Sequence, residues 1–310
     1  MVVTKAITLQ SVNGPEVTII QGQGPFGPGA CRCVYMTNGA LLGFTLTGGA
    51  TLTAGDGNYD QRGGGALVVS SGLLSNCVIC ANSAYGRAGG LYLWSGGRVV
   101  NSTLQGNTSA QSAGGAYMLY GGELSGCLVA SNQCGTSYNA GGLYCYSGAG
   151  GNPNVTNCAL IGNSATYGGG VAVYCSTAAS TVTINNCRFE GNTADQGGAI
   201  NCLNQNGVIR NCLIKHNRAR WWAGGVFLRL GSQLLNSSVF DNRCGGNGGG
   251  VEMADACLMK NCTVLGNYAA GGGSGVVFFN TVQTLENSIV WGSEGRPSLL
   301  ALARLIPPLI

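Results

Sequence analysis

Apolar and polar positions repeat along this chain with a period of about 25 residues. Nine units align on one polar position, which is occupied by Asn76, Asn101, Gly126, Asn157, Asn186, Asn211, Asn236, Asn261 and Asn287. Every unit has an apolar residue two positions before it, a Cys or Ser one position after it, and an apolar residue three positions after it. This alternation predicts strands with one buried face, and the interruption at the aligned position predicts a bend between two strands.

A second asparagine follows six residues later in most units, and a glycine pair then opens a third apolar segment. Both features predict bends, because Asn and Gly tolerate unusual backbone conformations. The inward pairs of the third strand are expected at Leu91/Leu93, Ala116/Met118, Leu143/Cys145, Val171/Val173, Val226/Leu228 and Val251/Met253. Three short strands per unit without helices predict an all-β fold, a right-handed parallel β-helix of about eleven coils.

We expect a single solenoid domain over residues 1–293. Residues 1–75 are predicted to form irregular first coils, with two strand–turn–strand segments at 6–22 and 38–49, and residues 76–293 to form regular repeats. Residues 294–310 depart from the pattern and predict a tail or a short capping helix. The chain begins with strand-like sequence, without a visible signal peptide or membrane span, which indicates a fragment of a longer protein.

Composition narrows the class of protein. The chain is 45% hydrophobic and only 8% charged, which excludes disorder, and its 55 glycines do not recur at every third position as in collagen. A net charge of +4 is too small to indicate a nucleic-acid partner. Cys127, Cys158, Cys187 and Cys212 form one inward column, and stacked parallel side chains are poorly aimed for disulfides, so we expect buried thiols. We expect no cofactor, no metal site and a monomer.

The repeats resemble those of bacterial right-handed β-helix surface proteins of the pectin-lyase-like class, and more narrowly those of polymorphic outer membrane proteins. That family carries FxxN and GGA[ILV] motifs. Here "FEGN" lies at residues 189–192, "GGAL" at 64–67 and "GGAI" at 197–200, with looser matches at other coils. The resemblance covers roughly residues 60–293. It implies a β-helix at the bacterial cell surface or outside the cell, with a role in adhesion.

One charged stretch, "NCLIKHNRARWWAGG" at residues 211–225, holds the only histidine of the chain. The repeat predicts cross-coil pairs of Lys215 with Glu190, Arg220 with Asp195 and His216 with Asp241, and a stack of Arg218 on Arg243. The candidate catalytic residues are Glu190, Lys215, His216, Arg218, Asp241 and Arg243. They would serve a polysaccharide lyase or hydrolase, with Trp221 or Trp222 stacking on a sugar, although the Asn-Thr-Asp, Asp-Asp and Gly-His-Gly motifs of polygalacturonases are missing. The other interpretation is a charged, solvated face.

A second candidate site is an aromatic stripe on the outward positions of the third strand. Its residues fall on four successive coils and are Tyr92, Trp94, Tyr117, Tyr144, Tyr146 and Tyr174. Stacked coils would join them into one surface suited to sugar or protein. The alternative is that loops cover the stripe, or that the rings stiffen the sheet.

These observations favour a non-enzymatic structural or binding module, secreted or on the cell surface, that recognises carbohydrate or protein through an outer face. The alternatives are a polysaccharide lyase or glycoside hydrolase, and an inactive fragment of a larger adhesin. A carboxylate and an arginine converging in one groove would favour the enzyme. An exposed aromatic stripe would favour binding through that stripe.

Overall fold

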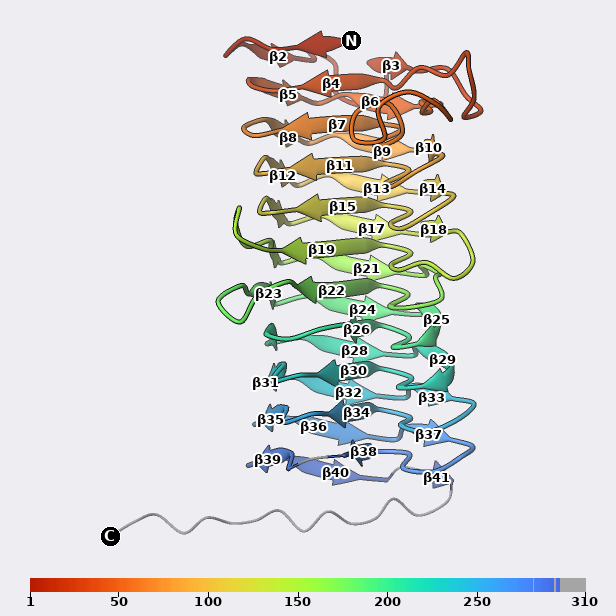
Figure 1. Cartoon of the computed structure of the whole chain (residues 1–310), viewed down its shortest axis with the longest axis vertical. Helices are drawn as coiled ribbons and strands as arrows, with labels where there is room; N and C mark the ends of the chain where they lie inside the picture. The colour runs from red at the N-terminus through yellow and green to blue at the C-terminus, as the bar shows by residue number, and fades with distance from the viewer. Residues whose placement is uncertain (281, 293, 296–310) are drawn as a thin grey trace, which may run out of the picture.

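The computed structural model describes residues 1–280, 282–292 and 294–295, and it forms one continuous parallel solenoid (Figure 1). Three parallel sheets of eleven strands each run along its length, and each coil contributes one strand to each sheet. The predicted architecture of three strands per coil and about eleven coils is confirmed. Among the described residues, no helix of a length and hydropathy suited to crossing a membrane occurs.

We name the three sheets A, B and C in the order in which a coil visits them. Sheet A consists of β1 (Val2–Val3), β4 (Val34–Met36), β7 (Ala66–Val69), β11 (Leu91–Trp94), β15 (Ala116–Leu119), β19 (Leu143–Ser147), β22 (Val171–Cys175), β26 (Ile200–Cys202), β30 (Val226–Arg229), β34 (Val251–Ala254) and β38 (Val276–Phe279). Sheet B consists of β2 (Thr8–Gln10), β5 (Ala40–Leu42), β8 (Leu73–Ser75), β12 (Arg98–Val100), β16 (Glu123–Ser125), β20 (Asn154–Thr156), β23 (Val182–Asn185), β27 (Gly207–Arg210), β31 (Gln233–Leu235), β35 (Leu258–Lys260) and β39 (Thr284–Glu286). Sheet C consists of β3 (Ile19–Gln21), β6 (Thr45–Thr47), β9 (Val78–Cys80), β13 (Thr103–Gln105), β17 (Leu128–Ala130), β21 (Ala159–Ile161), β24 (Arg188–Glu190), β28 (Leu213–Lys215), β32 (Ser238–Phe240), β36 (Thr263–Leu265) and β40 (Ile289–Trp291).

A short fourth side, which the sequence pattern did not predict, lies between sheets C and A. It is made of two small sheets, β10 (Ser83–Ala84), β14 (Thr108–Ser109) and β18 (Gln133–Cys134), and then β25 (Thr193–Gln196), β29 (Arg218–Trp222), β33 (Arg243–Cys244), β37 (Tyr268–Ala269) and β41 (Glu294–Gly295). The two tryptophans of the charged stretch, Trp221 and Trp222, therefore lie on a strand of this fourth side. This fourth side turns the chain toward sheet A and borders its outer face.

The predicted inward columns form the core. The side chains of Leu91, Leu93, Val226 and Leu228 are fully buried in one cluster that extends along the whole solenoid. The two predicted segments of the first 75 residues supply strands of the first two coils, as expected. The proposed capping helix or tail lies largely in residues 296–310, outside the described residues.

The two asparagine columns have different physical roles. The aligned asparagines between sheets B and C adopt a left-handed backbone, with φ of 55° at Asn211, which confirms the predicted bend. The second column is a buried ladder. The Nδ2 of Asn163 donates to Asn192 Oδ1 at 3.0 Å and to Val129 O at 2.9 Å, while Asn163 Oδ1 accepts from the backbone N and the Nδ2 of Asn132, both at 3.0 Å.

The glycine pairs before sheet A serve a different purpose from the one predicted. At Ala88–Gly89, the positive φ of 61° falls on the alanine. A Cβ on Gly89 would collide with the backbone of Thr108 on the next coil, so glycine is required there by the close approach of the fourth side. At Gly197–Gly198, in contrast, the first glycine has the positive φ, of 63°, that suits the predicted bend.

Removing one rung of the ladder should destabilise the solenoid strongly. Asn163→Ala deletes four hydrogen bonds and leaves buried partners unpaired, so we expect the free energy of unfolding to fall by about 3 kcal/mol or more. Chemical denaturation followed by circular dichroism measures it. Gln105→Ala, at an exposed position of β13, should change stability by less than about 0.5 kcal/mol. Equal stability of the two variants would contradict a structural role for the ladder.

Candidate functional site

The predicted charged cluster forms on the outer face of sheet C and the bend beside it. Glu190 accepts from Arg188 at 2.7 Å and lies 3.2 Å from Lys215 Nζ, and His216 lies 3.7 Å from Glu190 and 3.6 Å from Asp241. The predicted pairs of Lys215 with Glu190 and of His216 with Asp241 are confirmed. These groups are partly exposed, so each pair contributes about 0.2–1 kcal/mol.

His216 and Asp241 occupy a bend position that is glycine in the coils on either side. Both have a left-handed backbone, with φ of 55° and 53°, as do Gly191 and Gly266. Their side chains therefore project from a bend into solvent. A hollow of about 560 Å³ beside them is lined also by Arg243 and Tyr268.

The arginines of the cluster lie on the fourth side, around the corner from Glu190. Arg218 and Arg243 pair in register, as predicted, and neither forms an ion pair within the described part of the chain. The predicted pair of Arg220 with Asp195 is wrong. A bulge shifts the register between β25 and β29 at this point, and the Arg220 guanidinium lies instead over the Trp221 ring at 4.6 Å.

The electrostatics of this cluster do not favour acid catalysis at Glu190. A hydrogen bond from Lys215, supported by the charges of Arg188 and His216, holds the pKa of Glu190 below its ordinary value. An ionised, well-paired carboxylate cannot donate a proton at neutral pH. Nothing in this geometry distinguishes the cluster from a charged, solvated face.

Three rings of the aromatic stripe are covered and stacked, which is the alternative to an exposed binding surface that the sequence left open. Tyr92, Tyr117 and Tyr144 stack with ring centroids 5.1 and 4.6 Å apart, and all three are buried. Guanidinium groups cover them, because Arg62 lies over the Tyr92 ring and Arg87 over the Tyr117 ring, each at 5.2 Å. These three residues therefore do not meet the condition set for binding through the stripe, and the rings act as a second, outer core.

The outer row of the stripe remains half-buried. Tyr146 and Tyr174 stack at 4.9 Å, Tyr120 meets Tyr146 edge to face at 5.4 Å, and Trp94 packs against Tyr59 at 5.3 Å. These contacts fix the rings against loops that leave the coil. The row is therefore packed rather than free to accept a ligand along its full length.

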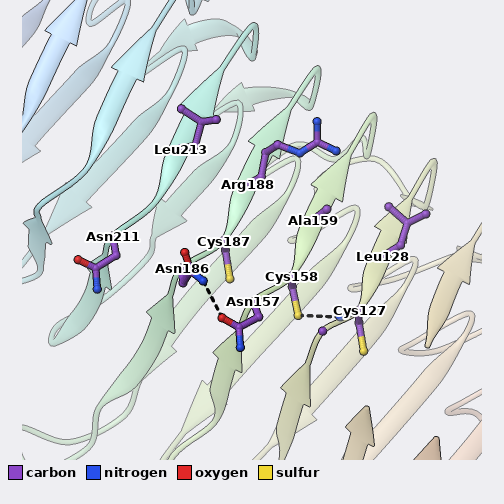
Figure 2. A pocket seen from close by; sticks show the side chains of 11 residues that line it. Cys127, Leu128, Asn157, Cys158, Ala159, Asn186, Cys187, Arg188, Asn211 and Leu213 are labelled. Atoms are coloured by element: carbon purple, nitrogen blue, oxygen red, sulfur yellow. Dashed lines mark hydrogen bonds between the residues drawn. The ribbon is translucent and has the colours of Figure 1, made fainter. Parts of the chain in front are cut away.

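The cysteine column is interior, as predicted. Figure 2 shows the thiols of Cys127, Cys158 and Cys187 stacked behind a shallow hollow of about 530 Å³, with Asn157 and Asn186 bonded to each other at its rim. All three side chains are buried, and they are free thiols. A hydrogen bond with Cys158 and burial raise the pKa of Cys127, which keeps that thiol protonated.

A groove that the sequence pattern did not reveal lies on sheet A beyond the end of the aromatic stripe. It has a volume of about 470 Å³ and is lined by Asn139, Tyr167, Gln196, Leu203, Trp222, Phe227, Arg229, Glu252, Ala254, Asp255, Phe279 and Asn280. Its floor is the outer face of β30, β34 and β38. One wall is a column on the border of the fourth side, in which Tyr167, Gln196 and Trp222 stand in register on successive coils.

Two polar side chains of the groove are incompletely satisfied. Glu252 is only 3% exposed, and its Oε2 has no hydrogen-bond partner. Arg229 lies over the Phe227 ring at 5.2 Å, and its Nε is also buried without a partner. Asn201, which stands in register with Phe227 one coil earlier, has an unpartnered Oδ1. Buried polar groups are usually paired, so this concentration marks the groove as a functional candidate.

Burial dominates the electrostatics of Glu252. It raises the pKa of this carboxyl from 4.5 to about 7, against the opposing effects of the Ala223 backbone and the Arg229 charge. A carboxyl and an arginine thus meet in one groove, with Asp255 lining it too. Within the described residues, no group of three or more potential metal ligands is present.

The sequence did contain a signal for this groove. The outward column of the third strand continues past Ala172 through Asn201, Phe227 and Glu252 with the same period as the tyrosines. Glu252 lies between the inward residues Val251 and Met253, so its side chain is at an outward position. The sequence pattern alone does not distinguish a buried outward residue from a solvated one. Its burial depends on the wall of the fourth side, which the pattern did not predict.

Comparison with known proteins supports the fold. A family model described as right handed beta helix region matches residues 167–300, which includes most of the groove. The searches of curated proteins and of solved structures gave no significant match. The chain is a right-handed β-solenoid, consistent with the pectin-lyase-like class. The narrower resemblance to polymorphic outer membrane proteins and the bacterial origin stay predictions.

Stability should depend on pH through Glu252. Because the folded pKa is raised, the folded state holds its proton more tightly than the unfolded state, so stability falls as pH rises from about 4.5 to about 7 and then levels. The loss from this group is about 3 kcal/mol. Denaturation midpoints of wild type and Glu252→Gln, measured from pH 4 to 8, should diverge with the variant more stable at high pH. Parallel curves would contradict a buried, neutral Glu252.

Proposed function

We propose that this chain is a non-enzymatic binding module of a secreted or cell-surface protein, and that it holds carbohydrate in the groove on the outer face of sheet A. The observation that carries the proposal is the combination of aromatic walls and unpartnered polar atoms in one groove. Tyr167, Trp222 and Phe227 offer ring faces, while Arg229 and Glu252 bring a guanidinium and a carboxyl group into the lining. Ligand sites of this kind are mostly apolar, with a few polar groups that fix orientation.

Carbohydrate suits this lining better than a protein partner. A sugar ring presents an apolar face of C–H groups, which packs on aromatic rings, and an edge of hydroxyl groups, which pair with buried polar atoms. Trp222 is 41% exposed and stands at the wall, where its ring is available to a ligand. The groove has a volume of about 470 Å³ and combines apolar side chains with a few polar groups, unlike the broad, flat surface of a protein interface.

The proposed placement outside the cell rests on the resemblance of the repeats to those of surface proteins. A stack of coils keeps a groove in fixed geometry along its axis, because each coil is tied to the next by backbone and asparagine bonds. A rigid stack presents such a groove far from its point of attachment. This property favours a module for adhesion or display.

Two adjacent tryptophans provide a matched test. Trp222→Ala should weaken carbohydrate binding at least tenfold, because it removes the ring at the wall. Trp221→Ala removes a ring of similar exposure, 49%, that does not line the groove, and should leave binding unchanged. A glycan array followed by calorimetry on the best ligand gives both values. Equal effects of the two substitutions, or no binding by wild type, would contradict the proposal.

Catalysis is a second candidate function, favoured by the meeting of Glu252, Arg229 and Asp255. In a hydrolase, Glu252 would give its proton to the glycosidic oxygen as the bond to the sugar breaks, and water losing a proton to Asp255 would add to the sugar. Incubation of wild type with each polysaccharide that it binds, followed by an assay for new reducing ends, tests this. Release of reducing ends that Glu252→Gln abolishes would establish hydrolysis, and intact polymer would exclude it.

A further inference from the structure

The groove extends along the solenoid axis over several coils. Its lining residues belong to six successive coils, from Asn139 before β19 to Phe279 on β38. Five steps at a strand spacing of about 4.8 Å give a length of about 24 Å. A ligand that fills it is therefore extended and lies parallel to the axis, as a linear oligosaccharide or a segment of a polymer would.

The charged groups of the groove are few and do not favour an anion. One guanidinium, that of Arg229, faces two carboxyl groups, Glu252 and Asp255. The wall from the fourth side adds no charge, because Asn139, Tyr167, Gln196 and Trp222 line it. A carboxylate or sulfate on a ligand would meet one cation and two acidic groups within the same narrow space, which costs desolvation without compensating pairing.

The unpartnered atoms also fit hydroxyl groups. Glu252 Oε2 needs a partner that can donate to it or accept from it, and Arg229 Nε needs an acceptor. A sugar hydroxyl both donates and accepts, so neighbouring hydroxyls on one ring could satisfy both atoms.

Two other arginines that form no ion pair within the described residues lie outside the groove. Arg218 and Arg243 stack on the fourth side next to the hollow beside His216 and Asp241, and neither lines the groove. An acidic polymer would be attracted to that face rather than to the groove. The molecule thus separates its basic surface from its aromatic groove.

We propose that the groove selects a neutral, linear glycan that lies along the solenoid axis, and that Glu252 recognises its hydroxyl groups. The inference rests on the proposed carbohydrate function and names its ligand class. Trp222 and Phe227 pack on the sugar faces, while Glu252 and Arg229 bind hydroxyls at the base. Acidic glycans of the same length are disfavoured in the groove.

The test compares hexasaccharides of equal length and different charge. Calorimetry at pH 6.5 and physiological salt would use cellohexaose, mannohexaose, xylohexaose and chitohexaose as neutral ligands and hexagalacturonate as the acidic ligand. We expect wild type to bind at least one neutral hexamer at least tenfold more tightly than hexagalacturonate. Trp222→Ala should abolish that preference, and Trp221→Ala should preserve it.

Substitutions at Glu252 separate recognition from folding. Glu252→Leu removes the hydroxyl contact and should weaken binding of the neutral hexamer at least tenfold, whereas the isosteric Glu252→Gln should recover most of the affinity. Circular dichroism and a thermal scan show whether each variant is folded. Wild-type affinity of Glu252→Leu for the neutral hexamer, with the fold intact, would overturn the role of Glu252 in recognition.

The outcomes distinguish the inference from the function on which it rests. Preference for hexagalacturonate that Trp222→Ala removes would leave a carbohydrate groove and overturn its neutral selectivity. Hexagalacturonate binding that only Arg218→Ala and Arg243→Ala remove would place acidic ligands on the basic face and support the separation. Binding of no hexamer, together with a blank glycan array, would overturn both proposals.

Discussion

The buried asparagine ladder fixes the distance and the register between coils, and the remaining columns depend on it. Each rung accepts from the asparagine of the preceding coil and donates to the asparagine of the following coil, as Asn163 does with Asn132 and Asn192. The amide geometry permits only one alignment of neighbouring coils. A one-residue slip would leave these buried groups unpaired and would turn the apolar columns outward. Once the ladder sets the register, inward residues of neighbouring coils, such as Leu93 and Met118, lie next to each other.

The ladder does not constrain the side chains on the outer face of sheet A. These side chains differ between the N-terminal and the C-terminal half of the sheet. In the N-terminal half, Tyr92, Tyr117 and Tyr144 stack under arginines and extend the core outward. In the C-terminal half, the same column contains Phe227 and Glu252, and a groove replaces the packed cover. The stability that the ladder supplies offsets the cost of this less complete packing. A solenoid whose coils are held together from inside therefore tolerates unpartnered polar atoms on one outer face.

Features that repeat could be predicted from the sequence, and features that break the repeat could not. The ladder, the inward columns and the contacts of Lys215 and His216 all follow from a constant period, because residues one period apart must be neighbours. The bulge at Asp195 changes the local count by one residue and broke the predicted pair with Arg220. Burial of Tyr117 and of Glu252 depends on covering groups from irregular segments, whose positions the period does not determine.

Each of the six coils along the groove contributes between one and three lining residues, while the ladder that holds those coils in place lies inside. Duplication of a whole coil would therefore lengthen the groove by one strand spacing and leave the geometry of its neighbours intact. Exchange of a single outward residue would alter recognition at one position along the ligand. Selectivity in such a molecule can change one sugar unit at a time, by gain or loss of repeats, without a new fold.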